Sequence, residues 1–299
     1  MSGRDAFGEY SPHVNMLFFA SAIILSIVLS HPAYLGISLF FAFTYVFTVR
    51  PVKGKKLLIR MGVLLILISV ISPLFNTMGD TVLFTYLRGR AYTLEALVCG
   101  ASQAMMAVSV LTWFSSYSEV MTSDRFMYVF APLAPALCLV LTMVLRLIPS
   151  YQRKASQISS SRSSVGKGAG EGTRRERIVS SLTVLGSLVS WALEGAVVTA
   201  DSMRSRGYGA NDRRSHFSLY RFDGRDAFML LLILALTGVS IFMISRGNAS
   251  AEFYPSVSLS AVTGGEGLIG AVSFGILCAV PAIINIGEKI IWQYSISKI

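Results

Sequence analysis

A group of arginines and glycines that follows an apolar segment is the part of this chain most suited to specific chemistry. The residues from Ser180 to Ala200 are mostly apolar and run directly into Asp201-Ser-Met-Arg-Ser-Arg-Gly-Tyr-Gly209. Gly207 is placed to end a helix in the left-handed conformation, and Arg206 is placed where a cation complements the negative end of the helix dipole. A guanidinium is a rigid fork of donors that suits carboxylates and carbonyls in a partner's groove. An equally open alternative from the residues alone is that Arg204 and Arg206 bind anionic lipid headgroups.

The composition places this segment in a membrane protein. Of the 299 residues, 53% are hydrophobic and 14% are charged, and the mean hydropathy of +0.61 exceeds what a soluble domain of this length needs. The chain is therefore predicted to be an all-α, polytopic membrane protein with about six transmembrane helices and long amphipathic helices on the cytoplasmic side. Apolar runs with almost no charge occur at 16–30, 33–49, 57–75, 94–116, 126–145, 227–244 and 268–286.

The first two runs are short and flank His31-Pro32, which predicts a tight helical hairpin. Only Arg4 stands against Asp5 and Glu9 before the first run, and no small-residue cleavage site closes it. We therefore expect the first run to be retained as a helix and not removed as a signal peptide.

The net charge of +10 comes from basic residues that cluster between apolar runs. The positive-inside rule explains this pattern more simply than binding to nucleic acid, so the three clusters are predicted to be cytoplasmic and the first, at 50–60, to be a loop. The clusters are Arg50, Lys53, Lys55, Lys56 and Arg60; Arg153, Lys154, Arg162, Lys167, Arg174, Arg175 and Arg177; and Arg204, Arg206, Arg213, Arg214, Arg221 and Arg225.

The number of apolar runs between these clusters restricts the topology. Three runs separate the first cluster from the second, and three crossings would put the second cluster outside. The run at 126–148 is the predicted exception, because Pro132 and Pro135 open it and Arg146 and Pro149 close it. The topology predicts that tags report the cytoplasm at Gly168 and Asn211 and the outside at Gly79 and Gly265.

The segment at 178–200 alone separates the second cluster from the third, so it too is predicted to re-enter or lie flat. Its polar residues recur at helical spacing opposite its apolar residues. The carboxylate of Glu194 is costly in lipid, which also disfavours a lipid-exposed span. The residues from Ser159 to Gly172 are rich in serine and glycine and are expected to be a flexible or turning connection. The polar stripe is Ser187, Ser190, Glu194, Asp201, Arg204 and Tyr208, and the apolar stripe is Leu185, Leu188, Ala192, Ala196 and Met203.

Several short motifs resemble one known family. Ser205-Arg206-Gly207-Tyr208, at the end of an amphipathic helix, resembles the second Ala-Arg-Gly motif of the T components of energy-coupling factor (ECF) transporters, the EcfT/CbiQ-like family. Leu145-Arg146-Leu147-Ile148-Pro149 is similar to the Arg-Phe-Ile-Pro element of that family's second coupling helix. Thr93-Leu94-Glu95-Ala96-Leu97 is similar to its entry into a membrane helix, and Arg213-Arg214-Ser215 is also similar. Where the first Ala-Arg-Gly motif should fall, this chain departs from the pattern with Ser161-Arg162-Ser163 and Gly166.

The resemblance implies a scaffold in the bacterial plasma membrane that couples ATP hydrolysis by two ABC-type ATPase subunits to toppling of a small substrate-binding membrane subunit. The imported solute would be a vitamin or a transition-metal ion. ATP and Mg would bind to the partner subunits, and this chain would bind no cofactor. The residues that the resemblance assigns to ATPase coupling are Arg204, Ser205, Arg206 and Gly207, with Arg162 and Gly166; Arg146, Pro149 and Glu194 would belong to the coupling helices.

Two other classes of function are weighed against this one. A stand-alone permease is expected to show inverted repeats, and none is visible. A membrane-embedded enzyme with a lipid-binding basic face needs several facing ionisable residues in its spans, where Glu194 is nearly alone. The motifs GxxxxGK[ST], HExxH and GxSxG do not occur, Gly264-Gly265-Glu266-Gly267 is expected to be an external loop, and the lone Cys99, Cys138 and Cys278 predict no metal site. The predicted regions are 1–117 and 227–299 for transmembrane helices and 118–226 for coupling helices.

Overall fold

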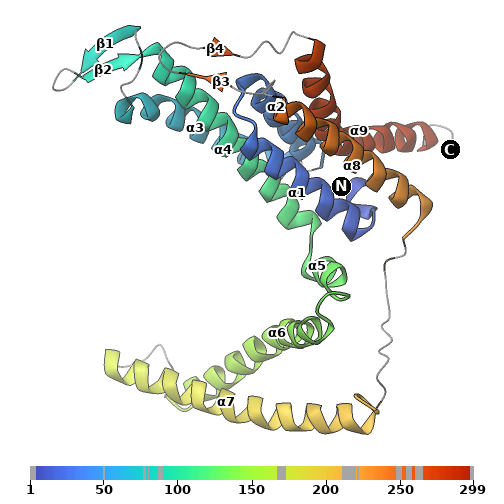
Figure 1. Ribbon diagram of the computed structural model, residues 1–299. Helices are drawn as coiled ribbons and strands as arrows, with labels where there is room; N and C mark the ends of the chain where they lie inside the picture. Colours follow the sequence, from blue (N-terminus) through green and yellow to red (C-terminus); the bar gives the residue numbers. More distant parts are fainter. Residues whose placement is uncertain are drawn as a thin grey trace. The chain divides into compact units, whose positions relative to one another are not determined.

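The computed structural model describes residues 5–49, 51–76, 79, 81–86, 90–166, 173–210, 220, 222–246, 251–253, 258–259 and 265–296. These residues are mainly helical, which confirms the predicted all-α class (Figure 1). The first two helices are linked by residues 29–31, as expected of a tight hairpin. The helices are η1 (Phe7–Glu9), α1 (Pro12–Val28), α2 (Pro32–Val49), α3 (Pro51–Phe75), α4 (Leu94–Val120), α5 (Ser123–Phe130), α6 (Pro135–Ser164), α7 (Arg174–Ser205), α8 (Gly224–Ser245) and α9 (Gly265–Ile296). The strands are β1 (Val82–Tyr86), β2 (Arg90–Thr93), β3 (Ala251–Glu252) and β4 (Ser258–Leu259).

The helices divide into two compact units. One consists of Met1–Phe126 together with Tyr220–Ile299, and it contains α1 to α4, α8 and α9; the other is Met127–Leu219, and it contains α6 and α7. The second unit falls inside the predicted middle region. The two ends of the chain thus build one helical bundle, and its middle builds a separate helix pair.

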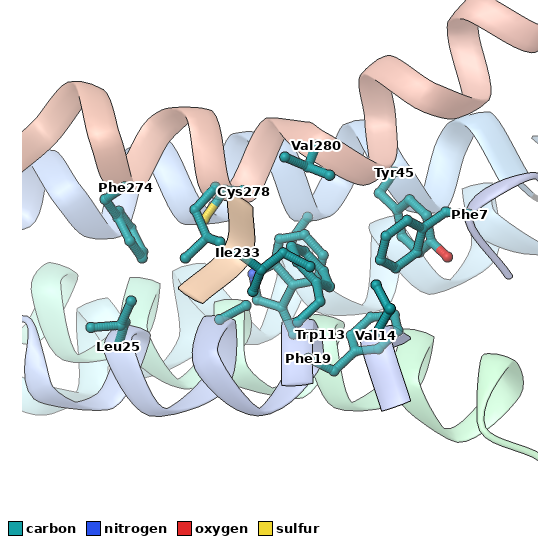
Figure 2. Packing of buried hydrophobic residues seen from close by; sticks show 14 of the residues in the cluster. Phe7, Val14, Phe19, Leu25, Tyr45, Trp113, Ile233, Phe274, Cys278 and Val280 are labelled. Atoms are coloured by element: carbon teal, nitrogen blue, oxygen red, sulfur yellow. The ribbon is translucent and has the colours of Figure 1, made fainter. Parts of the chain in front are cut away.

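The bundle has an aromatic core that joins its N-terminal helix to α4. Phe18 and Phe19 of α1 contact Trp113 of α4, with ring centroids 5.5 and 6.2 Å apart, and Phe7 meets Phe18 edge-on at 5.0 Å. Such edge-to-face pairs add about 0.5–1.5 kcal/mol each beyond the burial of their surface. Figure 2 shows the side chains that surround this cluster, among them Tyr45 of α2, Ile233 of α8, and Phe274, Cys278 and Val280 of α9.

A buried hydrogen-bond network centred on Ser38 of α2 joins three helices of the bundle. The Ser38 hydroxyl lies 2.8 Å from the hydroxyl of Ser26 on α1 and 2.6 Å from that of Ser109 on α4. It also accepts a hydrogen bond from Trp113 Nε1 at 3.1 Å. All four side chains are buried. Because buried polar groups are costly unless they are paired, this network favours one register of α1, α2 and α4.

Residues near the N-terminus bind to three helices at one end of the bundle. The side chain of Asn285 on α9 accepts a hydrogen bond from the Ala6 N–H at 2.8 Å and donates one to the Asp5 carboxylate at 2.9 Å. The Tyr45 hydroxyl of α2 donates to the other carboxylate oxygen of Asp5 at 2.8 Å. The Ser11 N–H donates to Asp226 of α8 at 3.0 Å. These bonds hold α2, α8 and α9 together through the segment that precedes α1.

The start of α4 has the geometry that its sequence predicts. Thr93 is the N-cap, and its hydroxyl accepts a hydrogen bond from the Ala96 N–H at 3.4 Å. The carboxylate of Glu95, in the first turn, accepts hydrogen bonds from the Thr81 hydroxyl at 2.6 Å and from its N–H at 3.2 Å. The residue before β1 is therefore fixed to α4, next to the antiparallel hairpin of β1 and β2.

Two predicted loops are wrong, because both segments belong to helices. At 50–60, α3 already begins at Pro51, a residue well suited to a first helical turn. Gly54 lies so close to α2 that an added Cβ would be 3.1 Å from the carbonyl oxygen of Val46. The predicted external loop at 264–267 is the first turn of α9 from Gly265 on, and the Gly267 carbonyl accepts a hydrogen bond from the Tyr34 hydroxyl at 3.1 Å.

Seven helices in the described part of the chain are long and apolar enough to cross a membrane. The chain is therefore a multi-pass membrane protein, and exposed apolar side chains such as Phe114 and Leu231 suit a surface that faces lipid. These seven helices include α6 and α7, so the placement of α6 and α7 as non-spanning helices stays a prediction. The apolar helix α1 is shorter than the seven candidates. The seven candidates are Pro32–Val49, Gly54–Phe75, Leu94–Val120, Pro135–Ser164, Arg174–Ser205, Gly224–Ser245 and Gly267–Gln293.

Candidate functional site

A turn splits the predicted apolar run at 126–145. The helix α5 ends at Phe130 and α6 begins at Pro135, so the break includes Pro132. Proline suits the first turn of a helix, where its missing N–H would have no helical partner. The predicted bend at the opening of this segment is confirmed.

The predicted break at the other end of the segment is wrong, because α6 runs on through Pro149. Proline removes one helical hydrogen bond, the one to the Leu145 carbonyl, and the helix tolerates this loss. The helix continues for four turns beyond this position, to Ser164.

The serine-rich stretch from Ser159 onwards is also more ordered than predicted. Residues 159–164 belong to α6, and the turn begins at Val165. The serine hydroxyls donate to carbonyls four residues earlier, which satisfies them inside the helix. These bonds are Ser160 to Ser156 and Ser161 to Gln157 at 2.9 Å, and Ser163 to Ser159 and Ser164 to Ser160 at 3.1 Å. The rest of the predicted connection, 167–172, lies outside the described residues.

The helix α7 starts with a capping box. The Thr173 N–H donates to the Glu176 carboxylate at 2.7 Å, and the Thr173 side chain accepts from the Glu176 N–H. This exchange satisfies two amides that would otherwise have no partner at a helix start. The long helix thus begins at a defined residue.

The two predicted stripes of α7 differ in exposure only in part. Ser187, Ser190 and Glu194 of the polar stripe are exposed. In the apolar stripe Leu188, Ala192 and Met203 are half-buried, whereas Leu185 and Ala196 are exposed. A further face of the helix is apolar and exposed, with residues three or four positions apart. These residues are Ile178, Leu182, Leu185, Val189 and Leu193.

The end of α7 confirms the predicted left-handed cap. Gly207 has φ +77°, and its N–H donates to the Arg204 carbonyl at 3.0 Å. The Tyr208 N–H donates to the Met203 carbonyl, also at 3.0 Å. These two bonds form a Schellman motif, with Arg206 as the C-cap residue. Arg204, Ser205 and Arg206 are all exposed there, so two guanidinium groups project from a well-defined helix end.

The end of α6 has the same backbone geometry but different side chains. Gly166 has φ +69°, and its N–H donates to the Ser163 carbonyl at 3.0 Å. When the two glycines are aligned, Val165 occupies the place of Arg206, because the arginine of α6 comes four residues before its glycine. Arg162 is half-buried, and one of its terminal nitrogens donates to the Ser180 hydroxyl of α7 at 3.4 Å. The two predicted coupling arginines therefore lie in different surroundings.

The other predicted residues lie along the helices and away from these ends. Arg146 and Pro149 are exposed in the middle of α6, and the Pro149 carbonyl accepts a hydrogen bond from Arg153 Nε at 3.3 Å. Glu194 is exposed on α7. Residues 213–215, which carry part of the family resemblance, lie outside the described residues.

One contact between the two helices was not predicted from the sequence. The ring of Trp191 on α7 meets Tyr151 of α6 edge-on, with centroids 5.5 Å apart, and Lys154 Nζ lies 5.7 Å from the centroid of the same ring. The spacing of Tyr151 and Lys154, one helical turn apart, is the sequence signal for this contact. That Tyr151 and Lys154 lie across from Trp191 can be predicted only when the register between the two helices is known.

The cysteines show no arrangement for chemistry. Cys99 and Cys278 are buried in the bundle, and Cys138 is half-buried on α6. Among the residues that the structure describes, no group of three or more His, Cys, Asp or Glu side chains is placed to hold a metal ion.

The fold defines an all-α, multi-pass membrane protein whose middle segment forms a separate pair of long helices. The model of the cobalt transport protein family matches residues 8–217, which is more than half of the chain and includes both long helices. The chain belongs to this family, and its class of function is transport.

Two curated relatives carry more specific names. The chain is 25% identical over 194 residues to the energy-coupling factor transporter transmembrane protein EcfT of Streptococcus equi subsp. equi, a match that covers 60% of this chain and 70% of the relative. It is 28% identical over 99 residues to the protein of the same name from Lactococcus lactis subsp. cremoris, which covers 33% of this chain and 37% of the relative. Both names agree with the family resemblance seen in the short motifs.

Proposed function

We propose that this chain is the transmembrane energy-coupling component of an ECF-type ABC importer in a bacterial plasma membrane. Its partners are two ABC-type ATPase subunits and a small membrane subunit that binds a vitamin or a transition-metal ion. The observation that carries the proposal is the end of α7, where a Schellman motif at Gly207 presents the exposed Arg204 and Arg206. This end lies within the residues that match the family model.

The rigid cap suits a side chain that has to transmit force. A guanidinium on a frayed helix end moves independently of the helix, whereas Arg206 precedes a glycine that is hydrogen-bonded back to Arg204. Its fork can pair with carboxylates or carbonyls of an ATPase groove, and movement of that subunit then moves α7 as a lever. Ser205 adds a hydroxyl that is bonded back to the Asp201 carbonyl at 2.8 Å, which further fixes the last turn.

The exposed apolar face of α7 suits the substrate-binding partner. Leu182, Leu185 and Val189 are each more than half exposed, although the helix also has a polar face that can meet water. An apolar face of this size needs lipid or protein against it. A membrane subunit that lies on this face would be moved whenever α7 moves.

In this role the chain hydrolyses nothing, and ATP with its Mg ion binds to the partner subunits. Purified alone in detergent, the chain should therefore show no ATP hydrolysis, and turnover that survives removal of every other subunit would contradict the proposal. The direct test is co-purification of the tagged chain with the products of neighbouring genes. The proposal requires an ATPase pair among them, and a chain that transports solute without any ATPase would support the stand-alone permease instead.

A comparison of two exposed arginines of α7 distinguishes ATPase coupling from the alternative that these arginines bind lipid headgroups. Arg177 lies in the first turn and Arg206 at the C-cap. Lipid binding predicts that alanine at either position lowers retention on anionic vesicles by a similar amount and leaves ATPase retention unchanged. Coupling predicts that only Arg206→Ala releases the ATPases.

A further inference from the structure

The contact between α6 and α7 contains few deeply buried side chains. In the described residues α6 has no buried side chain, and Ser180 is the buried residue of α7. Side chains such as Ile158 of α6 and Leu188 of α7 are half-buried. An open groove of about 650 Å³ lies on α6, and its lining includes Lys154, Ile158 and Arg162. This shallow packing leaves a role for specific contacts in setting the angle between the two helices.

Two specific contacts join the helices in addition to this shallow packing. At one point Arg162 donates to Ser180, and at the other Trp191 meets Tyr151 and Lys154. From Tyr151 to Arg162 and from Ser180 to Trp191 the spacing is the same, 11 residues. Eleven residues are close to three full turns, so both contacts lie on one face of each helix, about 16 Å apart.

We propose that these two contacts form a clamp that sets the angle at which α6 crosses α7, and that Arg162 is a positioning residue of this clamp instead of a docking residue for an ATPase. A single contact allows two helices to swivel about it, whereas two contacts three turns apart fix their direction. The inference rests on the proposed function only for its effect on transport. The clamp itself is a property of this chain.

The surroundings of Arg162 favour this role over docking. Its side chain is half-buried against α7, and Ser180, which accepts its hydrogen bond, is 6% exposed. Arg206, in contrast, is exposed at the very end of its helix. The Nε of Arg162 is buried without a partner among the described residues. The guanidinium therefore keeps this position although one of its donors makes no hydrogen bond there. Val165, at the position equivalent to Arg206, has no group that can pair with a carboxylate.

The test separates an effect through Ser180 from direct contact with a partner. Ser180→Ala removes the acceptor but leaves Arg162 in place, and Ser181→Ala is the matched control because Ser181 is the exposed neighbour on α7. Spin labels go on exposed positions of the two helices, at Ala136→Cys and Ser202→Cys, in a full-length chain whose native cysteines are replaced by alanine. The distance distribution between the labels is measured with and without the co-purified ATPases.

The clamp predicts that Ser180→Ala and Arg162→Ala both broaden this distribution and lower transport about three- to tenfold, as expected for loss of one long, partly exposed hydrogen bond. Both variants keep ATPase retention within about twofold of wild type, and Ser181→Ala changes neither quantity. A Ser180→Ala chain with the wild-type distribution would overturn the proposal, as would an Arg162→Ala chain that releases the ATPases as completely as Arg206→Ala.

Trp191 gives a second measurement should Ser180→Ala fold poorly. Trp191→Ala removes the ring from the other contact and should broaden the distribution, whereas Trp191→Phe keeps an aromatic face for Tyr151 and Lys154 and should preserve it. Equal distributions for the two variants would contradict the clamp. Failure of the proposed function would give a different result. The wild-type chain would retain no ATPases, while the label distances would still differ between the wild-type chain and these variants.

Discussion

Two tryptophans show how differently the two units of this protein are held together. Trp113 is fully buried in the bundle, where its ring contacts Phe18, Phe19 and Tyr45 and its indole nitrogen donates to Ser38. Trp191 is half-buried on α7, beside one tyrosine and one lysine of α6. The bundle is stable through its own core. The α6–α7 pair leaves most of its apolar surface available to other molecules, which is what a coupling element requires.

Replacing each tryptophan by alanine should give the largest difference in stability between the two units. Trp113→Ala removes a large buried ring and one of the three hydrogen-bond partners of Ser38, so we expect a loss of about 3–5 kcal/mol in unfolding free energy. Trp191→Ala should cost less than about 1 kcal/mol, because its site is partly open. The difference in stability is measured by thermal unfolding of both variants in the same detergent, with size-exclusion chromatography as the readout. Equal losses would show that the two units are held together in the same way.

Ser38→Ala tests the polar network by itself. It removes the oxygen that Ser26, Ser109 and Trp113 share, and we expect a cost of about 1–2 kcal/mol, since hydrogen bonds between membrane helices contribute little individually but share this atom. The control is Ser187→Ala on α7, whose hydroxyl is exposed and bonded to the Thr183 carbonyl of its own helix at 3.0 Å. That change should stay within about 0.5 kcal/mol. The same unfolding assay is used, and a neutral Ser38→Ala would show that the network does not stabilise the bundle.

Gly207→Ala has the most local effect of these changes, because it acts only on the end of α7. No atom lies within 4 Å of an added Cβ, so the expected cost of about 1–2 kcal/mol comes from the left-handed backbone alone. We expect faster amide exchange in the last turn of α7 and an unchanged melting temperature of the bundle. Gly186→Ala, inside α7 and equally free of neighbours, should instead slow exchange or leave it unchanged. Exchange at Tyr208 that matches wild type would contradict the role assigned to the cap.

The sequence predicted the helices well where local signals decide them. Thr93 marks the start of α4, Pro135 starts α6, and Gly207 ends α7 with positive φ. The wrong predictions of helix ends have local causes that cannot be recognised from composition. The serine-rich residues after Ser159 were expected to form a flexible or turning connection, but their hydroxyls donate to carbonyls four residues earlier in the same helix. Pro149 was expected to end α6, but the helix continues through it with one hydrogen bond fewer.

The candidate site was predicted only in part, because its second half depends on contacts between helices. The α7 end with Arg204 and Arg206 follows from residues adjacent in sequence. The contact of Arg162 with Ser180 joins residues 18 positions apart, and its geometry depends on the register of the two helices. The equal spacing of 11 residues in both helices was present in the sequence, but it acquires meaning only when the helices are known to pack antiparallel.

The most direct test of the account is retention of the ATPases by chains altered at Arg206, at matched expression. Removing one partner of a buried charge pair costs about 2–5 kcal/mol, so Arg206→Ala should weaken retention at least about 30-fold without unfolding the bundle. Arg206→Lys should restore only part of it, because an ammonium lacks the bidentate fork. Arg162→Ala should be the milder change, and the double variant should abolish transport. If Arg206→Ala retained the ATPases as well as wild type and transport continued, the coupling role would be wrong and the arginines would be assigned to lipid binding.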